Sequence, residues 1–333
     1  MSSISRSLVS WLLPITAACA GGTTAARDTV IVPADAQIEH LWGEGAFTEG
    51  AAVGPDGDIY FVDYPFDQTP GRVLKFSPET AETTVHCADS GKANGLMFDR
   101  QGRLIACCGS GYGKMALCEV LPDGKVRVLV DRYRGKRLNS PNDLVIDPQG
   151  RIYFSDPRYL GPEPMELDHM SVYRLDPNGT LVRLKTGLTK PTGIVISPDG
   201  QTMFIGESDN GSTTIDPTPP GTAVRMTLNA YPVRADGSLG DRRLLINYAK
   251  TNAGVDGMTV DTAGNIYAAI TAQKAIVVYT PEGQEQARIA FPESTTNCCF
   301  GRGTEASRLY ITAGKSLYRV RLGMDGYHPA TAE

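Results

Sequence analysis

Residues 142–156 read NDLVIDPQGRIYFSD, and this stretch decides the fold. It holds a short apolar strand, a turn with Pro and Gly, and a second strand rich in β-branched and aromatic residues, which is the pattern of a β-hairpin. Five more copies begin with a polar residue and keep this order: EGAAVGPDGDIYFVD at 49–63, NGLMFDRQGRLIA at 94–106, TGIVISPDGQTMFI at 192–205, DGMTVDTAGNIYA at 256–268, and a degraded copy at 297–311.

The spacing of the copies predicts a propeller. They begin 41 to 64 residues apart, and further hairpins lie between them, such as the one centred on residues 177–179. Four strands per unit at this period are typical of a propeller blade, so we predict an all-β fold, a six-bladed β-propeller with four antiparallel strands per blade. A β-sandwich would not repeat six times in register, and a β-helix would have a much shorter period. Residues 37–42 are predicted to add the outer strand that closes the last blade.

Composition and the N-terminus set the domain boundaries. The 333 residues carry a net charge of −5 without a block of Lys and Arg, so we expect no nucleic-acid partner. Arg6, an apolar run at 8–18 and the small residues around Cys19 are typical of a secretory signal peptide. We therefore predict a signal peptide and disordered N-terminus at 1–28, one propeller domain at 29–333, and an exported protein. A lipid-modified Cys19 is the alternative, and no later segment is apolar enough to span a membrane.

Six cysteines follow the predicted signal peptide. Their spacing, with adjacent pairs at 107–108 and 298–299, is unlike that of zinc ligands. An even number in an exported chain permits disulfides, with 15 possible connectivities. We expect structural thiols or disulfides and assign no pairs.

The repeat also predicts a site. One residue begins each inner strand at the same position before the turn, and equivalent positions of a propeller lie at one height around the axis. These six residues, which we call the polar ring, are Glu49, Asn94, Asn142, Thr192, Asp256 and Asn297. All of them offer oxygen and two are carboxylates, which suits a hard divalent cation such as calcium. The alternative is that they cap the inner strands and bind water in the channel.

Several motifs resemble the senescence-marker-protein/gluconolactonase family, the regucalcin-like lactonases. The resemblance covers residues 40–322 and is carried by FTEG at 47–50, SPND at 140–143, YFSDP at 153–157, VDGM at 255–258 and TNC at 296–298. It implies a six-bladed propeller with one divalent cation, usually Ca²⁺, in its channel. It implies Glu49, Asn142 and Asp256 as metal ligands. Family members usually carry Asn where this chain has Thr192, so the fourth protein ligand is open between Thr192, directly or through water, and water alone.

The reaction that this resemblance implies is hydrolysis of a sugar lactone or a related lactone. We expect the metal to polarise the carbonyl group and Asp256 to act as general base. Asn94 and Asn297 are predicted to bind substrate hydroxyl groups. Asp63 and Asp156, at the ends of second strands, are predicted either to support the metal ligands or to cap the strand ends.

Three other functions stay open: a phosphotriesterase using the same metal ring, an exported propeller that only binds a partner, and a condensing enzyme similar to strictosidine synthase. His169, in an insertion at 160–170, is predicted to be a solvated loop residue. The loop around Ser208 lacks the G-x-S-x-G motif of a serine hydrolase. The natural lactone, the physiological metal and the oligomeric state are open at this point.

Overall fold

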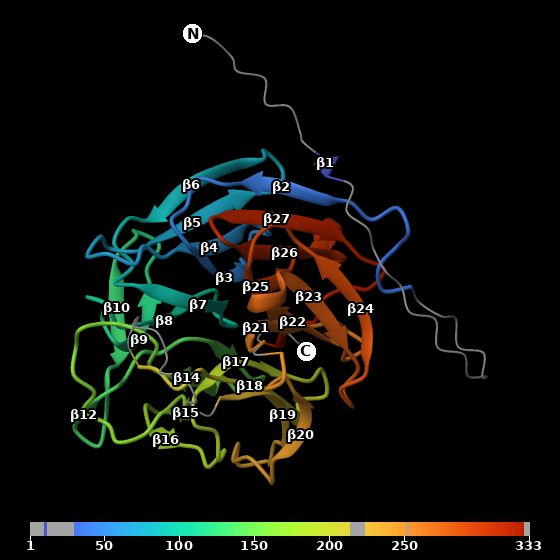
Figure 1. Cartoon of the computed structure of the whole chain (residues 1–333). Helices are drawn as coiled ribbons and strands as arrows, with labels where there is room; N and C mark the ends of the chain where they lie inside the picture. Colours follow the sequence, from blue (N-terminus) through green and yellow to red (C-terminus); the bar gives the residue numbers. More distant parts are fainter. Residues whose placement is uncertain (1–9, 12–29, 214–223, 252, 330–333) are drawn as a thin grey trace.

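The computed structural model describes residues 10–11, 30–213, 224–251 and 253–329. Six of its sheets stand around a central axis, and five of these blades have their first strand innermost (Figure 1). Five sheets are continuous in sequence. Their strands are β3 to β6 (Thr48–Val53, Ile59–Asp63, Arg72–Ser77, Glu82–Cys87), β7 to β10 (Ala93–Phe98, Leu104–Cys108, Ala116–Val120, Val126–Val130), β13 to β16 (Leu144–Ile146, Ile152–Asp156, Ser171–Leu175, Leu181–Arg183), β17 to β20 (Pro191–Ile196, Thr202–Asp209, Arg225–Pro232, Arg243–Asn247) and β21 to β24 (Val255–Val260, Ile266–Ile270, Ala275–Tyr279, Glu285–Ala290).

The sixth blade joins the two ends of the chain. Strands β25 (Thr295–Phe300), β26 (Arg308–Ala313) and β27 (Ser316–Arg321) come from the C-terminal part, and β2 (Ile38–Trp42) completes the sheet. Strand β2 runs antiparallel to β27, and the two lie side by side in Figure 1. The six-bladed propeller and the closing strand near residues 37–42 are therefore confirmed.

The remaining elements are short. A two-stranded hairpin forms between the second and third blades, two 3₁₀ helices lie in the last two blades, and a two-residue strand pairs with the edge of β2. They are β11 (Arg132–Tyr133), β12 (Lys136–Arg137), η1 (Thr271–Gln273), η2 (Gly303–Glu305) and β1 (Ser10–Trp11). Apart from β1, the predicted signal peptide with Cys19 lies outside the described residues. In the described part of the chain, no helix has the length and apolar character needed to cross a membrane.

The hydrophobic core lies between neighbouring blades. The second strand of a blade is covered on both faces, which explains its continuous apolar sequence, and every residue of β4, β8, β14 and β22 is buried. One cluster joins Val62 and Val73 of the first blade to Leu104 and Ala106 of the second. Burial of such side chains is the main stabilisation of the ring.

The six described cysteines belong to this core. All of them are buried free thiols (Cys87, Cys107, Cys108, Cys118, Cys298 and Cys299). Burial raises the pKa of Cys107 and Cys298 well above the usual value of a thiol. Of the two expectations, the structure has structural thiols and not disulfides.

Candidate active site

Five of the six polar-ring residues line one pocket of about 450 Å³ at one mouth of the channel. They are Glu49, Asn94, Asn142, Thr192 and Asp256. Each comes from a different blade, so residues that lie far apart in the chain meet because the blades repeat. Aromatic and aliphatic side chains also line this pocket, among them Phe47, Tyr64 and Phe66.

A glycine after the ring residue lets neighbouring inner strands approach each other. Gly50 follows Glu49, and a Cβ atom on Gly50 would lie 1.8 Å from the carbonyl oxygen of Asn94 in the next blade. Gly193 follows Thr192, and its Cβ would lie 1.9 Å from the carbonyl oxygen of Asp256. No side chain fits at these distances, so the repeated polar–Gly pair is needed for the ring to close around the channel. The pair is visible in the repeat, but only the spatial contact between blades reveals its role.

The inner hairpins have irregular register near the ring residues. The pairing of β21 with β22 shifts between Val255 and Met258, which places Asp256 and Gly257 opposite a single residue. Similar shifts occur in β7 and β17, around Asn94 and Thr192. A β-bulge turns a side chain out of the normal alternation, and Asn94, Thr192 and Asp256, which line the pocket, each lie at such a shift.

Acidic residues at the end of the second strands hold the segments that lead into the ring. Asp63 accepts hydrogen bonds from the main-chain N–H groups of Ala46, at 2.7 Å, and Phe47, at 3.4 Å. It also forms an ion pair of 2.9 Å with Arg72. These N–H groups lie three and two residues before Glu49, so Asp63 caps its strand end and orients a ring residue at the same time.

The same contact recurs in two other blades. Asp156 accepts from the N–H groups of Asn139, at 3.0 Å, and Ser140, at 2.7 Å, just before Asn142. Glu207 is fully buried and accepts from the N–H of Thr189 at 2.8 Å, three residues before Thr192. Asp63 and Asp156 were candidates from the sequence, whereas Glu207 was missed. The shared signal is an acidic residue near the end of the second strand.

The two carboxylates of the pocket repel each other. Burial and the charge of Asp256 raise the pKa of Glu49 well above its usual value. Burial and the charge of Asp143 raise the pKa of Asp256 to about 7. No Lys, Arg or His is among the described residues that line the pocket. Such a pair is stabilised in its ionised form by a bound cation.

The donor set of the pocket fits a hard divalent ion. Among its ring residues, two carboxylates, two amide side chains and one hydroxyl group offer oxygen, which calcium prefers. The Thr192 hydroxyl donates its hydrogen to the carbonyl oxygen of Val255 at 2.8 Å, so the lone pairs of its oxygen remain available to bind an ion or a water. Over the described residues, no group of three or more His, Cys, Asp and Glu side chains could hold a metal. A cation here would therefore depend on amide and hydroxyl oxygens as well as on Glu49 and Asp256.

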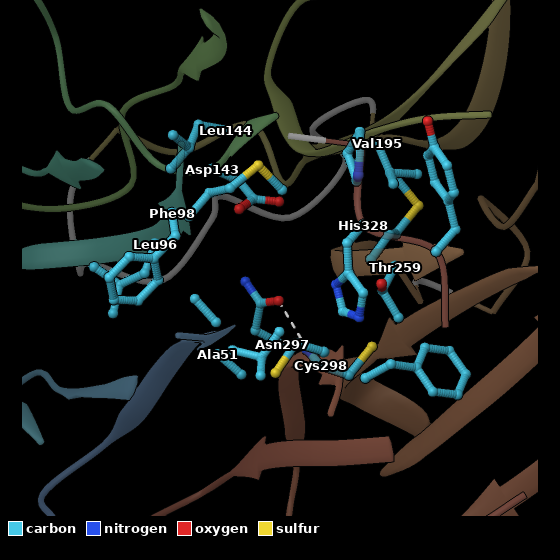
Figure 2. Close-up of a pocket in the computed structure, with 18 of the residues that line it drawn as sticks. Ala51, Leu96, Phe98, Asp143, Leu144, Val195, Thr259, Asn297, Cys298 and His328 are labelled. Atoms are coloured by element: carbon cyan, nitrogen blue, oxygen red, sulfur yellow. Dashed lines mark hydrogen bonds between the residues drawn. The ribbon is translucent and has the colours of Figure 1, made fainter. Parts of the chain in front are cut away.

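Asn297 lies elsewhere, and the expectation that all six ring residues meet at one mouth is wrong for it. Its side chain lines a second cavity, further along the inner strands, together with Asp143 and His328. Figure 2 shows the Asn297 amide facing Asp143, with a hydrogen bond from the N–H of Cys298 to Asn297 Oδ1 at 2.8 Å. The inner strand of the sixth blade shifts its register already at Thr296, and Asn297 then pairs regularly with Thr312. Its assignment as a substrate-binding residue of the first pocket is therefore corrected.

His169 is not among the residues that line either cavity. Its ring contacts Asp168 at 2.6 Å and the Tyr173 hydroxyl at 3.1 Å. Ser208 does line the first pocket, and its hydroxyl donates to Val255 O at 2.8 Å.

Comparison with known proteins gives the family. The model of the family described as "SMP-30/Gluconolactonase/LRE-like region" matches residues 42–315, which is most of the chain. The chain belongs to this family. The gluconolactonase of Zymomonas mobilis is 28% identical over 322 residues, covering 89% of this chain and 84% of that protein. The regucalcin of Gallus gallus is 29% identical over 252 residues, covering 74% of this chain and 77% of that protein.

A solved structure at 30% sequence identity has the same fold. It is described as a gluconolactonase from Xanthomonas campestris, and it superimposes with a TM-score of 0.74 at 30% identity, covering 95% of this chain and 99% of that chain. The family resemblance drawn from the sequence motifs is thus confirmed.

Proposed function

We propose that this protein is a lactone hydrolase that uses one divalent cation in the pocket of the polar ring. The observation that carries the proposal is the meeting of Glu49 and Asp256 with amide and hydroxyl oxygens in one pocket. Similar proteins named gluconolactonase and pentonolactonase support the reaction class. Similar proteins named regucalcin support a divalent ion, and we propose Ca²⁺.

The residues of the polar ring have different proposed roles. Glu49, Asn142 and Asp256 would hold the cation, with Thr192 adding its hydroxyl oxygen directly or through water. When bound, the cation supplies Lewis acidity to the lactone carbonyl and stabilises the negative charge that develops on its oxygen. Asn94, which lines the pocket, would orient the substrate.

Asp256 is the proposed general base. It takes a proton from the water that adds to the carbonyl carbon, and the bond between this carbon and the ring oxygen then breaks. The ring oxygen leaves with the proton, so that lactone and water become one hydroxy acid. The Thr271 hydroxyl donates to Oδ2 of Asp256 at 3.3 Å and fixes the orientation of the carboxylate.

The test is hydrolysis of glucono-δ-lactone and δ-valerolactone by the purified full chain, followed with a pH indicator. We expect a chelator to lower kcat by at least about a hundredfold, Ca²⁺ to restore it, and Asp256→Asn to lower it by a similar factor. The matched control is Asp123→Asn, in a solvent-exposed turn, which should keep full activity. Turnover that resists the chelator would contradict the metal, and full activity of Asp256→Asn would contradict its role as base.

A further inference from the structure

Three aromatic side chains form one side of the pocket, and we call them the aromatic wall: Phe47, Tyr64 and Phe66. The Phe66 ring centre lies 5.0 Å from that of Phe47 and 5.9 Å from that of Tyr64. Phe66 is 59% exposed, although its ring contacts those of Phe47 and Tyr64. A large apolar side chain left open to solvent at the mouth of a pocket is typical of a surface that binds an apolar group.

A buried lysine holds Phe66 in this exposed position. Lys92 is only 1% exposed, and its ammonium group donates to the carbonyl oxygens of Pro65 and, at 2.8 Å, of Asp67. These two carbonyl groups flank Phe66 in the chain. The same ammonium lies 5.2 Å from the ring centre of Tyr64. A desolvated charge is costly unless it is well bound, so this arrangement fixes the segment that carries the aromatic wall.

Several hydrogen-bond donors of the pocket are already used within the protein. Three hydroxyl groups that line it, those of Tyr64, Tyr159 and Thr192, donate to main-chain carbonyl oxygens at 2.8 to 3.0 Å. The Asn94 side chain forms a hydrogen bond with Glu49. A polyhydroxylated lactone needs a free partner for each hydroxyl group that it buries, because an unpaired buried polar group is unfavourable.

We propose that the preferred substrate is a lactone with an apolar substituent, such as an alkyl chain, that lies on the aromatic wall while the lactone ring lies over Glu49 and Asp256. This inference rests on the proposed lactone hydrolysis and narrows it to a substrate class. Phe66 then determines specificity, and Lys92 is a positioning residue for it.

Three lactones with the same six-membered ring test the proposal: δ-decalactone, which carries a pentyl chain, δ-valerolactone, which carries none, and glucono-δ-lactone, which carries hydroxyl groups. A fully buried methylene group is worth roughly fourfold in binding, and a wall that covers one side of a chain gives part of this. We therefore expect kcat/KM for δ-decalactone to exceed both other values by about tenfold or more. A higher kcat/KM for glucono-δ-lactone overturns the proposal.

Two variants test whether Phe66 and Lys92 cause the preference for δ-decalactone. In Phe66→Ala, the ratio of kcat/KM for δ-decalactone to that for δ-valerolactone should fall about fivefold, and Lys92→Met should lower the same ratio. The matched control is Tyr112→Ala: Tyr112 is 56% exposed and is not among the residues that line the pocket, so the ratio should not change. An unchanged ratio in Phe66→Ala overturns the proposal.

A binding measurement separates this inference from the reaction class. If none of the three lactones is hydrolysed faster than in buffer, the proposed function fails. Calorimetric titration with δ-decalactone then still decides the role of the wall. Binding that is at least about tenfold tighter to the wild type than to Phe66→Ala supports the proposed substrate class, and equal binding overturns it.

Discussion

Asp256→Asn removes one of two carboxylates that repel each other in the pocket, and it should stabilise the protein when no metal is bound. Burial and the charge of Asp143 raise the pKa of Asp256 from the usual 3.8 to about 7 in the folded chain. The stability linked to this group is complete below about pH 4 and is lost as the pH rises through 7, because ionisation is easier in the unfolded chain.

A shift of about three pKa units corresponds to about 4 kcal/mol at pH 8. The Asp256 side chain is only partly buried, so solvent screening lowers this figure, and we expect a gain of about 2 kcal/mol. The new amide can still accept the hydrogen bond from Thr271.

Urea unfolding at pH 4 and pH 8, with a chelator and with Ca²⁺, measures this effect. With the chelator, Asp256→Asn should be more stable than the wild type at pH 8, and the difference should nearly vanish at pH 4. With Ca²⁺ at about a hundred times its dissociation constant, the wild type should gain about 3 kcal/mol, whereas the variant should gain much less. A variant that is less stable than the wild type at pH 8 with the chelator, or one that gains equally from Ca²⁺, would refute this reasoning.

Three further predictions concern stability and thiol chemistry. Asp261→Ala should destabilise the fold by about 3 kcal/mol in urea unfolding, because this buried carboxylate accepts hydrogen bonds from two main-chain N–H groups, an amide and a tyrosine hydroxyl. The control Asp123→Ala, in an exposed turn, should change the stability little. Equal losses in the two variants would contradict the role of burial. The ring centre of Trp42, in the closing strand β2, lies 5.3 Å from that of Phe61 in the first blade, so Trp42→Ala should lower the free energy of unfolding by about 3 kcal/mol. A loss below about 1 kcal/mol would contradict the role of this contact in anchoring β2. The six buried thiols should resist Ellman's reagent in the native protein and all react in guanidinium chloride, whereas a smaller gain on unfolding would reveal a disulfide.

The sequence predicts the blades well because their hairpins are local. The strand, turn and strand of each copy lie within about fifteen residues, and their apolar pattern requires no knowledge of distant contacts. The polar ring follows from the same regularity, since equivalent positions of the repeated blades lie at the same height along the propeller axis. For this reason the repeat alone is enough to predict that Glu49 and Asp256, which lie in the first and fifth blades, meet at the channel.

Departures from the repeat could not be predicted. Asn297 belongs to the degraded sixth copy, and its side chain forms a hydrogen bond with Asp143 in the second cavity, a contact between blades that the repeat does not show. The aromatic wall depends on Lys92 reaching the loop around Phe66 from another blade, a contact that no local pattern indicates. Glu207, by contrast, follows the same pattern as Asp63 and Asp156, an acidic residue near the end of the second strand, and could have been found from it.

The seam between β2 and β27 also determines how the propeller responds to mechanical force. The chain enters β2 at Ile38 and leaves β27 after Arg321, and Ile38 pairs with Val320. Both strand ends therefore emerge on the same side of the seam, and force applied at Ile38 and Arg321 loads its hydrogen bonds one after another, as in a zipper. This geometry offers little resistance to tension, and once the seam has opened, the blades can unravel in turn from either end.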